Sequence, residues 1–336
     1  MGWLRLFLAY LVALSHAGFG IAGYNPGVIA VVSFFLLSGY VMTVLLDRHY
    51  RTADRAFAFY LDRAARLFPQ FGFYCLATLV LMSVLPIANP FLANCTAAKV
   101  ALNAAILPLD FFQFTSIESC MLIPQAWSLG LEMSFYLVAP IIVVAPAALR
   151  WMVLGSIVVF AAAYGGAINT DAFGYRLLPG TLFIFAVGAA FAKPVLWRWF
   201  PAAVWAGSAI LLCGLYLHRP FLELPHSKEV LAGLVIGIPV LYVLKDRPFG
   251  ALDEVLGNLS YGVFLNHFFC IYVLQAAGIE IVRLRHVALL IAVSTVLSAV
   301  SYLVIERPAL QWRRRIRYGR FDRHETDRAR TEMGCA

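Results

Sequence analysis

An arginine and a histidine lie eleven residues apart inside the first apolar stretch of the sequence. Arg5 and His16 share one face of a helix, since eleven residues make about three turns, and they lie about 16 Å apart along its axis. An ionisable side chain in lipid is costly, and it normally faces a bundle interior, a pathway or a reaction site. His16 is therefore the first candidate for chemistry. The alternative is a histidine that is hydrogen-bonded in the bundle core.

A carboxylate in a later apolar stretch is the candidate partner of this histidine. Glu132 lies about two turns into the span that begins near 125, counted from its external side, which places it at a depth similar to that expected for His16. A buried carboxylate near a buried imidazole can orient the ring and stabilise the imidazolium. We therefore expect Glu132 to assist His16, on the basis of depth alone. A second intramembrane histidine, His267, either binds substrate or pairs within the bundle.

Two arginines three residues apart introduce another apolar stretch. Arg63 and Arg66 lie on one helix face, at the expected boundary of the membrane. Two guanidinium groups so placed suit a multiply charged phosphate ligand, and the alternative is snorkelling to lipid headgroups. Glu306, at the end of the last apolar stretch, either pairs with Arg63 or Arg66 or shapes the mouth of a ligand site.

The elements that position these side chains must lie in lipid. The sequence is 62% hydrophobic and 13% charged, with a mean hydropathy of +0.81, whereas a soluble domain has about a quarter of its residues charged. This composition therefore predicts an all-α polytopic membrane helix bundle.

The first apolar stretch also resembles a secretory signal with a cleavage site at Ser15 to Ala17, an alternative that would remove His16. Apolar runs of about 20 residues give ten candidate spans, near 3–22, 27–46, 66–87, 125–146, 150–168, 176–193, 201–217, 229–245, 254–277 and 286–305.

The basic residues predict the orientation of this bundle. With the N-terminus in the cytoplasm, 20 of the 26 Lys and Arg residues fall inside, and the other six fall outside: Lys99, Arg176, Arg219, Lys228, Arg283 and Arg285. This split follows the positive-inside rule, so we expect both termini to be cytoplasmic. Nine of the inside charges follow Glu306, mostly in a basic tail over 311–336. Such a cluster beside a membrane grips anionic headgroups, so lipid and not nucleic acid is the expected partner.

Two of the six cysteines lie in the longest stretch between spans, 88–124, which is expected outside the cytoplasm. There Cys95 and Cys120 either form a disulfide that pins the loop or remain unpaired, partly buried thiols. The other cysteines show no metal-ligand spacing, and no metal is expected.

Six motifs, taken in order, resemble the acyltransferase 3 family of integral membrane O-acyltransferases over essentially all of residues 3–310. The resemblance therefore implies one acyltransferase domain over 1–310, followed by the tail 311–336. Gly262 and Phe264 stand where the family often has Ser and Tyr. The motifs are Arg5 to His16, Phe34 to Ser38 and Gly39, Arg63 and Arg66 with Pro69, Trp127 and Ser128 through Glu132 to Tyr136, Ser260 and Tyr261 to His267, and Glu306 to Pro308.

The resemblance implies an enzyme of the bacterial inner membrane that moves an acyl group, most often acetyl from cytoplasmic acetyl-CoA, to a hydroxyl of a sugar or glycan. His16 would deprotonate the acceptor or relay the acyl group, with Glu132 as the second catalytic residue. The first, second, fourth and ninth spans would enclose a tunnel for the pantetheine arm. A proton-coupled transporter and a non-catalytic scaffold are the alternatives. The remaining roles implied are binding of CoA phosphates by Arg5, Arg63 and Arg66, and support of substrate or structure by Ser38, Trp127, Ser128, Tyr261, His267 and Glu306.

Overall fold

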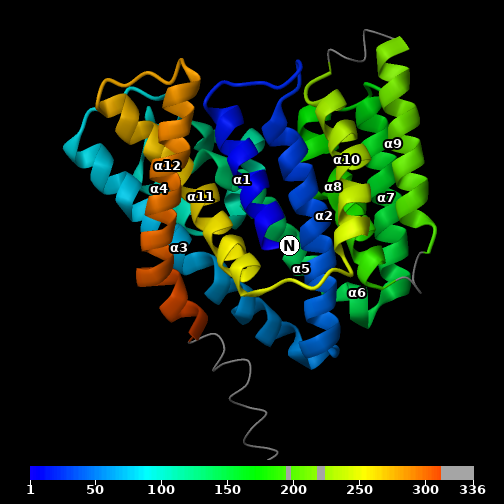
Figure 1. The fold of residues 1–336 in the computed structure, drawn as a ribbon. Coiled ribbons are helices and arrows are strands. Elements are labelled where there is room, and N and C mark those ends of the chain that lie inside the picture. Colours follow the sequence, from blue (N-terminus) through cyan, green and yellow to red (C-terminus); the bar gives the residue numbers. More distant parts are fainter. Residues whose placement is uncertain (194–197, 218–223, 312–336) are drawn as a thin grey trace, which may run out of the picture.

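The computed structural model describes residues 1–193, 198–217 and 224–311, which form a bundle of helices with no β-strand (Figure 1). The predicted all-α class is confirmed, while most of the predicted tail 311–336 lies outside the described residues. Short 3-10 turns occupy much of the segment between α3 and α5, and π-helical turns span Ala172–Arg176 and Tyr302–Glu306. The helices are α1 (Gly2–His16), α2 (Pro26–His49), α3 (Ala56–Val84), α4 (Ala97–Ala104), α5 (Trp127–Val138), α6 (Ile141–Val144), α7 (Pro146–Tyr164), α8 (Leu178–Ala192), α9 (Phe200–Leu217), α10 (Ser227–Leu244), α11 (Ala251–Ala276) and α12 (Leu284–Ser301).

Nine helical segments in the described part of the chain are long and apolar enough to cross a membrane. They correspond to nine of the ten predicted spans. The predicted third span, 66–87, begins too late. The helical segment there runs over Ala53–Val84 and includes charged residues that a hydropathy window starting at 66 leaves out. Arg63 and Arg66 therefore lie two to three turns inside α3 and not at its start.

The predicted first span, 3–22, is too long, because α1 ends at His16. Gly18 has a φ of 86°, a left-handed conformation that glycine adopts without steric cost. The amide of Gly18 donates to the carbonyl of Ser15, and that of Phe19 donates to the carbonyl of Leu14. This pair of hydrogen bonds is the Schellman arrangement that closes a helix. His16 thus lies in the last turn of α1, at the end of the bundle near the α1–α2 loop (Figure 1).

Helix α2 joins the two sides of the bundle. It packs along α1 on one side and along α8 and α10 on the other (Figure 1). A Cβ atom on Gly39 would lie 1.9 Å from the carbonyl oxygen of Phe185, and one on Gly188 would lie 2.0 Å from that of Leu36. The backbones of α2 and α8 therefore touch at these glycines, as small residues allow in membrane helices. This contact fixes the wall of the bundle that carries Ser38.

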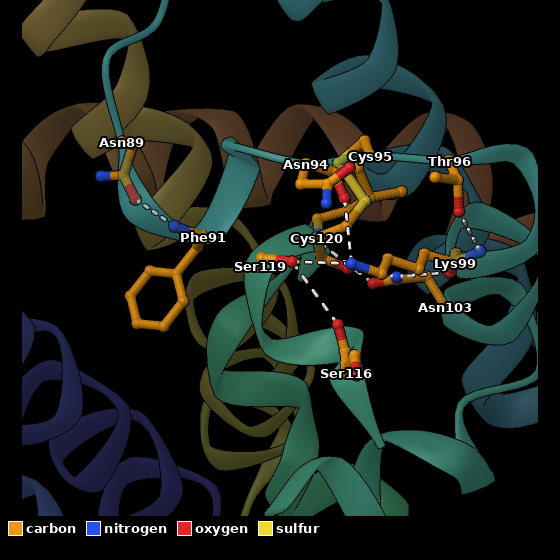
Figure 2. Close-up of a disulfide and its surroundings, with 11 residues drawn as sticks. Asn89, Phe91, Asn94, Cys95, Thr96, Lys99, Asn103, Ser116, Ser119 and Cys120 are labelled. Atoms are coloured by element: carbon orange, nitrogen blue, oxygen red, sulfur yellow. Dashed lines mark hydrogen bonds between the residues drawn. A yellow bond between two sulfur atoms is a disulfide. The ribbon is translucent and has the colours of Figure 1, made fainter.

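A disulfide joins Cys95 and Cys120 in the segment between α3 and α5 (Figure 2). Lys99 Nζ donates to Ser119 Oγ over 2.7 Å, and Asn103 Nδ2 donates to the carbonyl of Cys120 over 2.7 Å. Of the two alternatives that the sequence left open, the structure therefore contains the disulfide. Closing a loop of 25 residues stabilises a fold by about 3 kcal/mol in the chain-entropy account. The bridge holds the chain just before α5.

A buried carboxyl group lies where this segment packs against α5. A Cβ atom on Gly130 would lie 2.6 Å from the amide nitrogen of Asp110, so the two backbones are in close contact. Asp110 is 1% exposed and accepts a hydrogen bond of 2.6 Å from Ser134 Oγ, while its Oδ1 has no partner among the described residues. Burial raises the pKa of Asp110 to about 7, against the opposing effect of the Ser134 hydrogen bond.

We expect the protein to lose stability as pH rises from about 4 to about 7, because the fold favours the protonated form of Asp110. This contribution is fully present below the carboxyl pKa of the unfolded chain and is lost as pH passes the raised pKa of the folded chain. Asp110→Asn should flatten this slope in melting temperatures measured in detergent between pH 4 and 8. The control is Glu118→Gln, which changes an exposed carboxylate of the same segment. Parallel slopes for Asp110→Asn and the unchanged protein would contradict the prediction.

Candidate active site

Three arginines and a glutamate line a cavity of about 160 Å³ near the end of the bundle where α11 begins. We call it the lower cavity. Its walls come from α1, α2, α3, α5 and α11. The charged residues that line it are Arg5, Arg63, Arg66 and Glu132.

Two of the three arginines are paired. Arg63 forms an ion pair with Asp62, and Arg66 forms one with Glu306 while its guanidinium lies 5.2 Å from the centre of the Tyr261 ring. The expectation that Glu306 pairs with one of the two arginines is confirmed for Arg66. The side chain of Arg5, in contrast, makes no hydrogen bond and no ion pair within 4.0 Å among the described residues. Arg5 shares the cavity with Glu132, and it is the lining guanidinium whose hydrogen-bond donors have no partner among the described residues.

Glu132 belongs to this lower cavity. It accepts hydrogen bonds from Ser38 and from Tyr136, the latter over 2.7 Å. The predicted pairing of Glu132 with His16 is therefore wrong. The two side chains line different cavities, and His16 has another partner. The prediction rested on depth alone, which does not say toward which neighbour a helix turns each side chain.

The partner of His16 is His267. His16 Nδ1 lies 3.0 Å from His267 Nε2, and the two rings stack with 5.1 Å between their centres. His267 Nδ1 lies 3.2 Å from the carbonyl oxygen of Val263, an acceptor only, so this nitrogen carries a proton. With both rings neutral, His267 Nε2 then accepts from His16 Nδ1, and His16 Nε2 keeps its lone pair. The network thus assigns the tautomer in which His16 can act as a base.

His16 lines a second cavity of about 80 Å³, which we call the upper cavity. Helices α1, α2, α5 and α11 contribute to both cavities, and these are the four spans that the resemblance implied. Val31, Ser128 and Phe264 line both cavities, and we call these three residues the neck. Ser128 donates from Oγ to the carbonyl of Gln125 over 3.1 Å, which keeps its hydroxyl against its own helix. The neck is where the lower and upper cavities meet.

The upper cavity also contains residues that sequence reasoning missed. Arg176 and His226 line it, and Asp171 Oδ1 lies 2.8 Å from Arg176 Nε and 3.3 Å from His226 Nε2. Trp127, a predicted site residue, lies beneath the Arg176 guanidinium. Burial lowers the pKa of His226, and this outweighs the opposing effect of Asp171. In the sequence, Arg176 counted only as one of the external basic residues.

Comparison with known proteins places the chain among membrane acyltransferases. It is 33% identical over 196 residues to a protein described as uncharacterized from Aquifex aeolicus (strain VF5), covering 54% of this chain and 84% of that one. It is 29% identical over 304 residues to the exopolysaccharide production protein ExoZ of Rhizobium meliloti (strain 1021), covering 86% and 91%. It is also 28% identical over 338 residues to the "Putative membrane-bound transacylase BcsY" of Komagataeibacter xylinus, covering 93% and 83%.

No solved structure matches the chain. The family model described as "Acyltransferase domain" matches residues 1–303, which include every charged residue that lines either cavity. The protein is therefore a multi-pass membrane acyltransferase, and the chain belongs to the Acyltransferase domain family.

Proposed function

We propose that the protein transfers a short acyl group, acetyl in the first instance, from acyl-CoA in the cytoplasm to a hydroxyl of an exopolysaccharide or its lipid-linked precursor. One observation carries this proposal: the uncommitted guanidinium of Arg5 and the basic nitrogen of His16 lie in two cavities that meet at the neck. The name of ExoZ supports the class of acceptor, since that relative is an exopolysaccharide production protein.

The lower cavity suits the donor. Arg5, Arg63 and Arg66 line it, and the guanidinium of Arg5, which has no ion pair within 4.0 Å among the described residues, supports binding of an anionic group such as a CoA phosphate. The basic loops of the predicted cytoplasmic side support an orientation with this cavity facing the cytoplasm and both termini inside. The pantetheine arm would then pass from the lower cavity through the neck, and the thioester would lie beside His16.

The chemistry at His16 is an acyl transfer. The acceptor oxygen bonds to the thioester carbon as His16 Nε2 takes the hydroxyl proton, and the carbonyl electron pair moves onto oxygen. When that pair returns, the carbon–sulfur bond breaks, and the CoA thiolate leaves and is protonated by the imidazolium. His267 is a positioning residue, because its Nε2 holds His16 in the required tautomer.

The test is acceptor-dependent release of CoA thiol from acetyl-CoA by the purified protein. We expect thiol to appear only when acetyl-CoA and the glycan acceptor are both present, and mass spectrometry of surface glycans should show one acyl group lost when the protein is absent. A proton-coupled transporter would move solute without releasing thiol. Absence of thiol release with glycans from the producing cell would overturn the proposal.

A further inference from the structure

Arg176 is held by a π-helical turn at the edge of the upper cavity. The turn, Ala172–Arg176, brings Arg176 over Asp171, and Nε of the arginine donates to Asp171 Oδ1 over 2.8 Å. Residues five apart would not face each other on an α-helix, whereas a π turn aligns them. A Cβ atom on Gly180 would lie 1.5 Å from the carbonyl oxygen of Phe173, so α8 packs directly on the turn and fixes it.

Three aromatic rings lie close to the guanidinium. It lies 4.4 Å from the centre of the Trp127 ring, 5.2 Å from that of Tyr175 and 5.3 Å from that of Phe112. Nη2 lies 3.5 Å from His226 Nε2. Nη1 has no hydrogen-bond partner in the described ranges, so one arm of the fork is held in place with its protons uncommitted. Such a preorganised donor pays little reorganisation cost when a negative charge forms beside it.

The lining of the upper cavity favours an anion. It contains Arg176, the imidazoles of His16 and His226, and neutral amides and hydroxyls, and none of the described lining residues carries a carboxylate. Asp171 pairs with Arg176 without lining the cavity. The hydrogen-bond donors of Arg176 therefore face a cavity wall without a carboxylate, beside the place where His16 would receive its proton.

The size of the upper cavity suits a small anionic group. An engineered protein cavity of about 150 Å³ takes one benzene ring, and the upper cavity, at about 80 Å³, is about half that size. A carbonyl group and the oxygen that attacks it fit in such a space. The anion that matches this cavity is thus the oxygen of the reacting carbonyl.

Resting on the proposed function, we propose that Arg176 is a catalytic residue that stabilises the oxyanion of the acyl-transfer transition state. As the acceptor oxygen bonds to the thioester carbon and His16 takes its proton, the carbonyl electron pair moves to oxygen, and Arg176 Nη1 donates to that oxygen. The pair then returns, the carbon–sulfur bond breaks, and CoA leaves as the thiol with the proton from His16. Asp171 is a positioning residue that aims the guanidinium.

The kinetic test replaces the guanidinium in steps. Arg176→Gln should lower kcat for thiol release by about 10²–10³-fold, the usual cost of losing one oxyanion donor, while the KM for acetyl-CoA changes less than about threefold. Arg176→Lys should keep part of the rate, and Arg176→Ala should recover part of it when guanidinium is added at millimolar concentration. Arg150→Gln is the matched control, because Arg150 is exposed and lines neither cavity. An unchanged kcat, or a loss confined to the acceptor KM, would overturn the proposal.

A binding test separates this inference from the proposed function, because it needs no turnover. The probes are two CoA thioethers, one that carries a phosphonate in place of the acetyl group and one that carries a neutral acetonyl group. The protein should bind the tetrahedral anion more tightly, and Arg176→Gln should remove that preference without weakening the neutral probe. Equal preference in both proteins would overturn the role of Arg176 even if thiol release is observed. A failure of the proposed function appears instead as no thiol release and no binding of either probe.

Discussion

Replacement of His16 by alanine is expected to lower the rate of acyl transfer by about 10²–10⁴-fold, the usual contribution of a general base. His16 Nε2 is the nitrogen that the hydrogen bonds to His267 and Val263 leave with a lone pair in the upper cavity. Acetyl-CoA binding should persist, since the guanidinium groups of the lower cavity are untouched. The measurement is acceptor-dependent release of CoA thiol under single-turnover conditions, beside a binding isotherm for acetyl-CoA.

Two further histidine variants give this prediction its controls. His286→Ala removes a partly buried histidine on α12, outside both cavities, and should leave the rate unchanged. His267→Gln keeps a polar partner for His16 but not the fixed acceptor nitrogen. Its rate of thiol release should therefore fall between the rates of His16→Ala and His286→Ala. If His16→Ala releases thiol as fast as the unchanged protein, His16 has only a packing role.

The second large effect is expected at Arg5. Arg5→Ala should weaken acetyl-CoA binding by about 10- to 100-fold, because a hydrogen bond to a charged group contributes about 1.5–3 kcal/mol. Arg5→Lys should restore part of the affinity, since lysine keeps the charge but loses the planar fork. The measurement is equilibrium binding of acetyl-CoA to the purified protein, with the melting temperature as a check on folding.

Arg5 gives a cleaner test than Arg66 for a structural reason. Glu306 is 2% exposed and is paired with Arg66, so Arg66→Ala would leave a buried carboxylate uncompensated, at a cost of about 3–5 kcal/mol to the fold. Arg5→Ala breaks no ion pair within 4.0 Å among the described residues. The control is Arg150→Ala, on the exposed side of α7. An affinity for acetyl-CoA that is equal in Arg5→Ala and Arg150→Ala would assign the donor to another surface.

Much of the fold could be predicted because lipid imposes a simple rule on sequence. A membrane helix must be apolar for about 20 residues, so nine of the ten predicted spans have their counterparts in the structure. The length of α1 was missed because hydropathy does not report backbone conformation, and Phe19 and Ile21 extend the apolar run after the helix has ended at His16. Gly18, at the position that closes the helix, was a usable signal.

The sequence predicted the position of each site residue along its helix, but not which neighbouring helix its side chain faces. Spacing on α1 correctly assigned Arg5 and His16 to one side, and the structure places both on cavity walls. The same reasoning paired His16 with Glu132, because depth gives a position along a helix but not the neighbour that a side chain faces. Arg176 could not be found in this way, since its spacing of five from Asp171 is meaningful only in a π turn. A single sequence gives little warning of such a turn.

The neck has a consequence for the membrane as an electrical insulator. A protein with polar cavities toward both sides endangers the ion gradient across its membrane, because a continuous file of water would conduct protons. Val31 and Phe264 line both cavities with apolar side chains, and the Ser128 hydroxyl there is bound to its own helix. Constrictions of this kind expel water, and an ion would have to shed its hydration shell to pass. We therefore expect the neck to bar hydrated ions from passing between the two cavities.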